Sequence, residues 1–186
     1  MSFFINGWKL EDYQKTLNEC ANTEDKPEQL ELWNGDEQAV ALDDLCTLLK
    51  KMNGNQQVSS CDAFIDRDDE YYFIEFKNQP VKNIETVDVQ KKAFISPTIV
   101  QMLLKQDESF ESISEKSHLY VVYQDDESDY YGKIQNKVHE FAKLNGEPLR
   151  FGLRLHAGNM LYKEVRTIPL SVFNSVYGKR IFCKEQ

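Results

Sequence analysis

The segment Tyr71–Lys77 constrains the fold more than any other part of the chain. It reads Tyr-Tyr-Phe-Ile-Glu-Phe-Lys, and aromatic and β-branched residues of this kind favour β-strands. In the preceding segment, Ser60–Asp66, the side chains alternate between the two faces of a predicted strand. A charged turn over 67–70 joins the two segments. Together they predict a β-hairpin. Because Tyr71–Lys77 has the composition of a buried strand, we expect the hairpin to lie inside a larger sheet.

The rest of the chain alternates between helical and strand-like patterns. Apolar residues at three- and four-residue spacings predict a helix over Asp36–Met52, which Asn53-Gly54 would end. Further patterns predict a helix over 87–106 that starts anew or kinks at Pro97, strands over 118–123, 149–155 and 160–168, and helices over 130–144 and 169–176. A weak helical pattern covers 10–21. This order predicts one α/β domain over residues 1–186, with a mixed central sheet flanked by helices.

Charge and composition narrow the classes of function. The 186 residues include 31 acidic and 22 basic ones, a net charge of −9, and 41% are hydrophobic, which fits one globular domain. An acidic body repels polyanions at long range, so tight non-specific binding to nucleic acid is disfavoured. No apolar run approaches the about 20 residues of a membrane span, and the first residues lack the pattern of a signal peptide. The four scattered cysteines indicate reduced thiols in a cytoplasmic protein.

Three charged residues fall on one face of the predicted hairpin. Side chains alternate along a strand, so Glu75 and Lys77 point the same way, and pairing within the hairpin can bring Asp62 beside Glu75. Two neighbouring carboxylates are tolerable when they share a cation, and oxygen ligands suit Mg²⁺ or Mn²⁺. A metal ion and a lysine at one strand end are the parts that phosphodiester hydrolysis requires.

Asp62, a hairpin and then Glu75-Phe76-Lys77 resemble the motif of the PD-(D/E)XK nucleases. The resemblance covers about residues 36–124 and implies a restriction-endonuclease-like core. It implies that Asp62 and Glu75 bind Mg²⁺ or Mn²⁺, with the backbone carbonyl of Phe76 as a third ligand. It also implies that Lys77 is the catalytic lysine and that Gln79 is the polar residue often found two positions later. The chain departs from the motif in having Cys61, not proline, before the aspartate.

The same resemblance suggests roles on the two helices beside the hairpin. In this family a helix before the hairpin often carries an acidic residue near the metal. Glu37 is the candidate here, with Asp43 or Asp44 behind it. The helix after the motif lines the site in many members, where Gln90, Lys91 and Lys92 would face phosphate.

The sequence therefore leaves two functions open. The first is a Mg²⁺-dependent nuclease acting on DNA or RNA. The second is an acidic binding module of the same fold without catalysis, such as an immunity protein or antitoxin, which would cover a basic protein partner. An exposed Glu-x-Lys pair on a strand is also common by chance and contributes little to stability.

Overall fold

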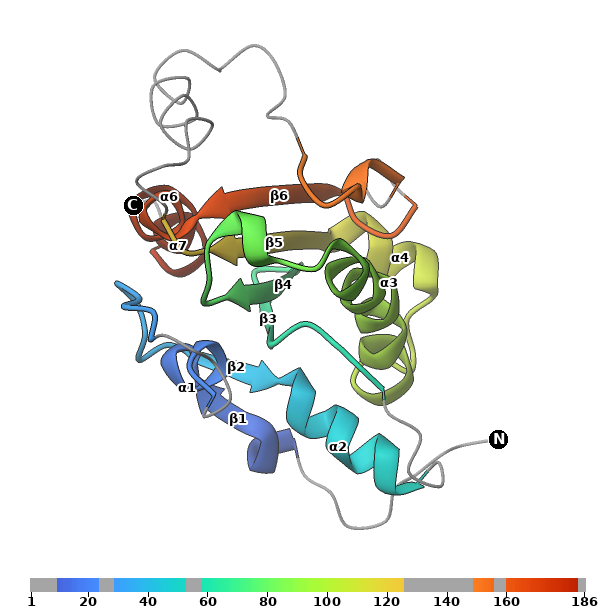
Figure 1. Ribbon diagram of the computed structural model, residues 1–186. Coiled ribbons are helices and arrows are strands. Elements are labelled where there is room, and N and C mark those ends of the chain that lie inside the picture. Colours follow the sequence, from blue (N-terminus) through green and yellow to red (C-terminus); the bar gives the residue numbers. More distant parts are fainter. Residues whose placement is uncertain (1–9, 24–28, 53–57, 126–148, 156–159, 184–186) are drawn as a thin grey trace.

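A six-stranded mixed sheet forms the centre of the computed structural model, which describes residues 10–23, 29–52, 58–125, 149–155 and 160–183 (Figure 1). The spatial order of the described strands follows the chain: β1 (Gln14–Thr16), β2 (Gln38–Ala41), β3 (Ala63–Arg67), β4 (Glu70–Lys77), β5 (Ser117–Tyr123) and β6 (Glu164–Pro169). Pairing is antiparallel from β1 to β4 and parallel from β4 to β6. The prediction of an α/β protein with a mixed sheet is confirmed.

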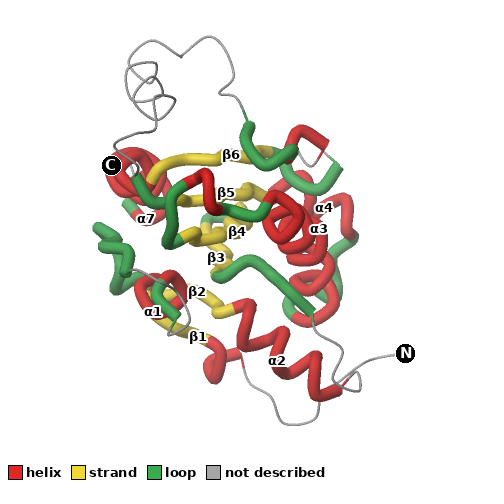
Figure 2. Tube along the Cα trace, viewed as in Figure 1, coloured by secondary structure: helices red, strands yellow, loops and turns green. Residues whose placement is uncertain are grey.

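Helices cover both faces of this sheet (Figure 2). On one face lie α2 (Leu42–Met52), α3 (Thr86–Leu103) and α4 (Phe110–Lys116). On the other lie α1 (Leu17–Ala21), α6 (Leu170–Val172), a π-helical turn (Phe173–Tyr177) and α7 (Gly178–Phe182). Short 3-10 turns occupy Leu10–Tyr13, Val81–Asn83 and Leu153–Leu155. Within the described residues, no helix has the length and apolar character needed to cross a membrane.

The β3–β4 hairpin forms as the sequence predicts. Ala63 pairs with Ile74, and the turn between the strands places Asp68 and Asp69 at positive φ angles of 54° and 63°. Aspartate tolerates this left-handed conformation better than most residues, because its short side chain bonds locally. Side chains then alternate: Ile74 packs on the α1 and α7 face, whereas Phe73 packs toward α2 and α3. Glu75 and Lys77 share the parity of Phe73, which directs them to the α2 and α3 face.

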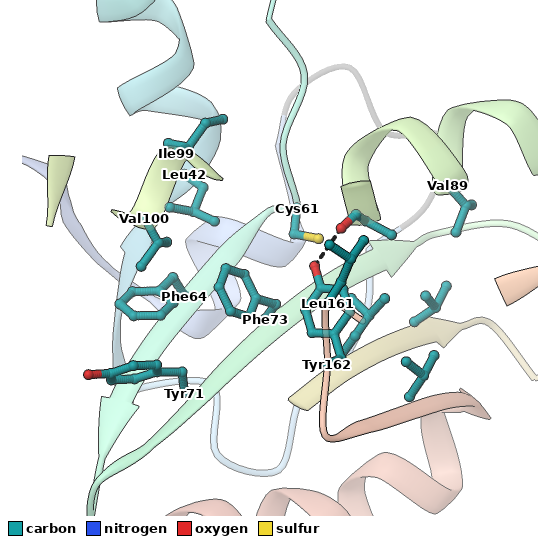
Figure 3. Packing of buried hydrophobic residues seen from close by; sticks show 14 of the residues in the cluster. Leu42, Cys61, Phe64, Tyr71, Phe73, Val89, Ile99, Val100, Leu161 and Tyr162 are labelled. Carbon is teal, nitrogen blue, oxygen red and sulfur yellow. Dashed lines mark hydrogen bonds between the residues drawn. The ribbon is translucent and has the colours of Figure 1, made fainter. Parts of the chain in front are cut away.

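Aromatic packing attaches α3 to the sheet (Figure 3). The ring of Phe73 lies 5.1 Å from that of Phe64 and 5.5 Å from that of Tyr162, centroid to centroid. The Tyr162 hydroxyl donates a hydrogen bond of 2.7 Å to the carbonyl oxygen of Ala93. Pro97 lies four residues after Ala93 and has no N–H to donate to that carbonyl, so Tyr162 supplies the missing donor. The helix therefore continues through Pro97 instead of starting anew there.

Several predicted boundaries are wrong. The helix predicted over Asp36–Met52 begins at Leu42, because Gln38–Ala41 is strand β2, which pairs with both β1 and β3. Residues 149–155 are not a strand: Phe151 and Gly152 have positive φ angles, and a 3-10 turn follows.

Other elements differ in extent. The strand predicted over 160–168 starts at Glu164, the helix predicted from 169 becomes three short helical pieces reaching Phe182, and α4 was not predicted. A 3-10 turn, β1 and α1 replace the weak helix over 10–21. The helix predicted over 130–144 lies outside the described residues.

A buried histidine joins the three parallel strands near the start of β5. His118 is 4% exposed, and its two ring nitrogens lie 2.7 Å from a carboxylate oxygen of Glu70 and 2.9 Å from one of Glu164. Arg166 also contacts Glu164 at 2.8 Å. Burial alone would raise the pKa of Glu164, but the hydrogen bonds from His118 and Arg166 outweigh it and lower this pKa to about 2. This cluster lies at the opposite end of β4 from Glu75.

Candidate functional site

A pocket of about 460 Å³ opens at the carboxyl end of β4. Its walls come from α2, the residues just before β3, the end of β4 and the first turns of α3. β4 and β5 are parallel here, and ligands of α/β proteins commonly bind beyond the carboxyl ends of such strands. Six of the residues lining the pocket carry charge, three acidic and three basic, as Asp43, Lys50, Glu75, Lys77, Asp88 and Lys92.

Two buried carboxylates lie side by side at this end of the sheet. Asp62 is 3% exposed and Glu75 is 1% exposed. Asp62 directly precedes β3, and continuing the hairpin register from the Ala63–Ile74 pair sets it opposite Glu75. The Asp62 Oδ2 atom accepts a 2.6 Å hydrogen bond from the backbone N–H of Phe76, which holds the aspartate against β4. The pairing that the sequence predicted for Asp62 and Glu75 is therefore present.

Two lysines neutralise this pair. The Lys77 ammonium lies 2.8 Å from the Glu75 Oε1 atom and 2.6 Å from the Asp88 Oδ2 atom. The Lys92 ammonium lies 2.9 Å from Glu75 Oε1, 3.2 Å from its Oε2 and 3.6 Å from Asp62 Oδ1. One cation thus reaches both carboxylates at once.

Burial and charge perturb these groups in opposite directions. Burial, and next the charge of Asp62, raise the pKa of Glu75 to about 7, although Lys92 and Lys77 act to lower it. Burial alone would lower the pKa of Lys92, but Glu75 and Asp62 outweigh it and raise this pKa above its ordinary value. The pKa of Lys77 is raised in the same way, because Glu75 and Asp88 outweigh its burial. Both lysines therefore stay charged, and the charge on Glu75 depends on them.

Helix α3 contributes side chains to the site from positions that follow each other at four-residue spacing. Asp88, Lys92 and Ser96 lie on one face of the helix. The buried Ser96 Oγ accepts a 2.8 Å hydrogen bond from the backbone N–H of Cys61 and donates one of 2.7 Å to the Lys92 carbonyl oxygen. A proline at position 61 could not make this bond, because it has no N–H. Cys61, which stands where the nuclease motif has proline, is therefore hydrogen-bonded to α3 through its backbone N–H.

Sequence reasoning missed Asp88 and Ser96. The signal was available, since both stand four residues from Lys92 on a segment with a helical pattern. What the sequence lacked was the rotation of the helix about its axis, which packing of Ala93 against Tyr162 sets.

The other predicted residues are distributed unevenly. Gln79 lines the pocket, whereas the Lys91 side chain is exposed. Glu37 lies at the opposite end of β3, where its carboxylate is 3.9 Å from Arg67, so the structure does not bring it to Asp62 and Glu75. Asp44 pairs with Lys15 at 2.8 Å. Asp43 does line the pocket, and its Oδ1 atom accepts a 3.1 Å hydrogen bond from the Ser60 hydroxyl.

The carboxylate pair fits a hard divalent cation, although the described residues contain no group of three or more histidine, cysteine or acidic side chains arranged around one metal position. The Lys92 ammonium lies 2.9 Å from Glu75 and 3.6 Å from Asp62, so both carboxylates face the same cation in this structure. Mg²⁺ commonly takes one or two carboxylates and completes its shell with water and phosphate oxygens.

Comparisons of the chain with models of protein families, with curated proteins and with solved structures find no match.

Proposed function

We propose that this protein hydrolyses phosphodiester bonds in nucleic acid with Mg²⁺ or Mn²⁺, as the PD-(D/E)XK nucleases that it resembles do. The observation that carries the proposal is that Asp62 and Glu75 both face one cation, the Lys92 ammonium, and that Lys77 lies on the same strand face as Glu75. Burying two carboxylates costs free energy of folding. Buried ionisable groups of this kind cluster at functional sites of proteins.

The arrangement of elements gives the proposal a second support. A helix, an antiparallel hairpin, a second helix and a strand parallel to the hairpin follow in order as α2, β3 with β4, α3 and β5. This is the order that a restriction-endonuclease-like core implies, and we propose that core for residues 36–124.

Five polar residues at the site have a defined part in the proposed reaction. Asp62 and Glu75 would hold the metal ion, which would supply positive charge against the phosphate and a more acidic bound water. Lys77 presents its ammonium at the pocket, and Asp88 keeps it in place through the 2.6 Å ion pair. Gln79 lines the pocket and offers a hydrogen-bonding group to the substrate. The substrate's negative charge develops beside Lys77, where an ammonium is most effective because burial limits solvent screening.

A cleavage assay with matched variants tests the proposal. Purified wild type is incubated with single-stranded DNA, duplex DNA and RNA, each with Mg²⁺, Mn²⁺ or a chelator. We expect metal-dependent cleavage of at least one substrate, lost in Glu75→Gln and in Lys77→Met. Glu37→Gln and Lys91→Met remove the same charges away from the carboxylate pair and serve as controls. Cleavage that persists in Glu75→Gln, or none by wild type on any substrate, would refute the assignment.

The acidic binding module stays the second candidate, because Lys92 and Lys77 already neutralise the carboxylates without a metal ion. The net charge of −9 would also speed association with a basic protein. This function predicts no heat from Mn²⁺ at millimolar concentration in calorimetry. It also predicts association with a basic partner that weakens with added salt and is unchanged in Glu75→Gln.

A further inference from the structure

The Lys92 ammonium contacts the carboxylate oxygens of Asp62 and Glu75 that a shared metal ion would need as ligands. It contacts both oxygens of Glu75, at 2.9 Å and 3.2 Å, and lies 3.6 Å from Asp62 Oδ1. Its side chain is 15% exposed, while both carboxylates are more deeply buried. A divalent ion on the same oxygens would meet this ammonium at contact distance, and like charges in a buried site repel strongly.

The ammonium has somewhere to move. Lys92 itself lines the pocket, together with Lys77 and Gln79. A lysine carries its charge on a flexible four-carbon stem, so rotation of the stem carries the ammonium into the pocket without moving α3. The helix stays in place because Ser96 and Ala93 bond to neighbouring segments.

The geometry points to Lys92 as an internal cation that closes the metal site and is released into the pocket when a metal ion binds. This inference rests on the proposed metal site. In the resting protein the ammonium neutralises Asp62 and Glu75. In the metal-bound protein it faces the pocket, where it contacts a phosphate group of the substrate. Lys92 therefore competes with the metal ion for the two carboxylates and binds phosphate once it is released.

Release of Lys92 couples the binding of the metal ion to the binding of a phosphate group. A metal ion makes the ammonium available to phosphate, and a phosphate group that holds the ammonium in the pocket leaves the carboxylates available to metal. Linkage requires that phosphate raises the affinity for the metal ion by the same factor as the metal ion raises the affinity for phosphate. We therefore expect a nucleoside monophosphate to raise the affinity for Mn²⁺ in wild type and to have a smaller effect in Lys92→Met.

Mn²⁺ titration of three proteins measures the competition directly. Calorimetry is done on wild type, Lys92→Met and Lys91→Met, each first shown to be folded by circular dichroism. We expect Lys92→Met to bind Mn²⁺ at least about tenfold more tightly than wild type, because the competing cation is gone. Lys91→Met loses the same charge from the exposed position next along the helix, and we expect less than a twofold change.

A second measurement uses wild type alone and so does not depend on how a variant folds. Lysine amines are acetylated under limiting reagent with and without Mn²⁺, and mass spectrometry reports the rate at each site. We expect Mn²⁺ to speed modification of Lys92 severalfold and to leave Lys91 unchanged.

The outcomes separate the two ideas. Tighter binding by Lys92→Met together with faster acetylation of Lys92 supports both. Mn²⁺ binding by wild type that Lys92→Met does not strengthen, with unchanged acetylation of Lys92, overturns the displacement while keeping the metal site. No Mn²⁺ binding by either protein at millimolar concentration overturns the proposed function and the inference with it.

Discussion

Removing the Lys92 ammonium should destabilise the fold, and by an amount that depends on pH. Lys92→Met keeps most of the side-chain stem but leaves Glu75, which is 1% exposed, with less neutralising charge. Breaking a buried ion pair from one side costs about 3–5 kcal/mol when the remaining charge is uncompensated. Lys77 still lies 2.8 Å from Glu75 in the variant, so we expect a smaller cost, about 2–3 kcal/mol near pH 8.5.

The pH dependence follows from the raised pKa of Glu75. In wild type this pKa is about 7, above the ordinary 4.5, so the stability that Glu75 contributes is present below 4.5 and is lost as pH rises to 7. Without Lys92 the pKa rises further, and the variant goes on losing stability above pH 7 where wild type no longer does. The difference between them should grow by up to about 1.4 kcal/mol for each pH unit in that window.

Urea unfolding followed by circular dichroism at pH 6, 7 and 8.5 measures this. Lys91→Met is the control and should cost under about 0.5 kcal/mol at every pH, since its side chain is exposed. The double variant Lys92→Met with Glu75→Gln should recover part of the loss at pH 8.5, because glutamine needs no counter-charge. A cost for Lys92→Met below about 1 kcal/mol at pH 8.5, or one that does not change between pH 6 and 8.5, would refute the reasoning.

Three further variants test contacts that stabilise the fold, the first two beside the site and the third at the opposite end of β4. Ser96→Ala leaves the buried Cys61 N–H without its acceptor and should cost about 1–3 kcal/mol in urea unfolding, with weaker Mn²⁺ binding as the sign that Asp62 has shifted; unchanged binding would contradict the positioning role. Tyr162→Phe removes the donor to the Ala93 carbonyl and should cost about 1–2 kcal/mol, seen as a lower melting temperature. Glu164→Gln should be less stable than wild type at pH 6 by up to about 3 kcal/mol. That gap should close as pH falls from 4.5 toward 2, because the lowered pKa of Glu164 contributes stability only above that window. A gap that persists at pH 2 would contradict the assignment.

Local pattern was a good guide where periodicity and turn chemistry agreed. The hairpin, the facing of Glu75 and Lys77, and the helix over most of 87–106 all follow from residues close together in the sequence. Local pattern misled where short apolar runs fit two structures. Val40 and Ala41 suit the face of a helix as well as a strand, and only pairing with the neighbouring strands β1 and β3 makes them a strand.

The sequence by itself determined the hairpin and the carboxylate pair, because strand alternation and hairpin register act over a few residues. Only the tertiary structure decided which charges complete the site. The packing of α3 against Tyr162 and Phe73 rotates Lys92 and Asp88 toward Glu75, and strand β2 carries Glu37 to the far end of β3. Those outcomes depend on contacts between residues far apart in the chain, such as Cys61 with Ser96, 35 positions apart, and Ala93 with Tyr162, 69 positions apart, which no local pattern encodes.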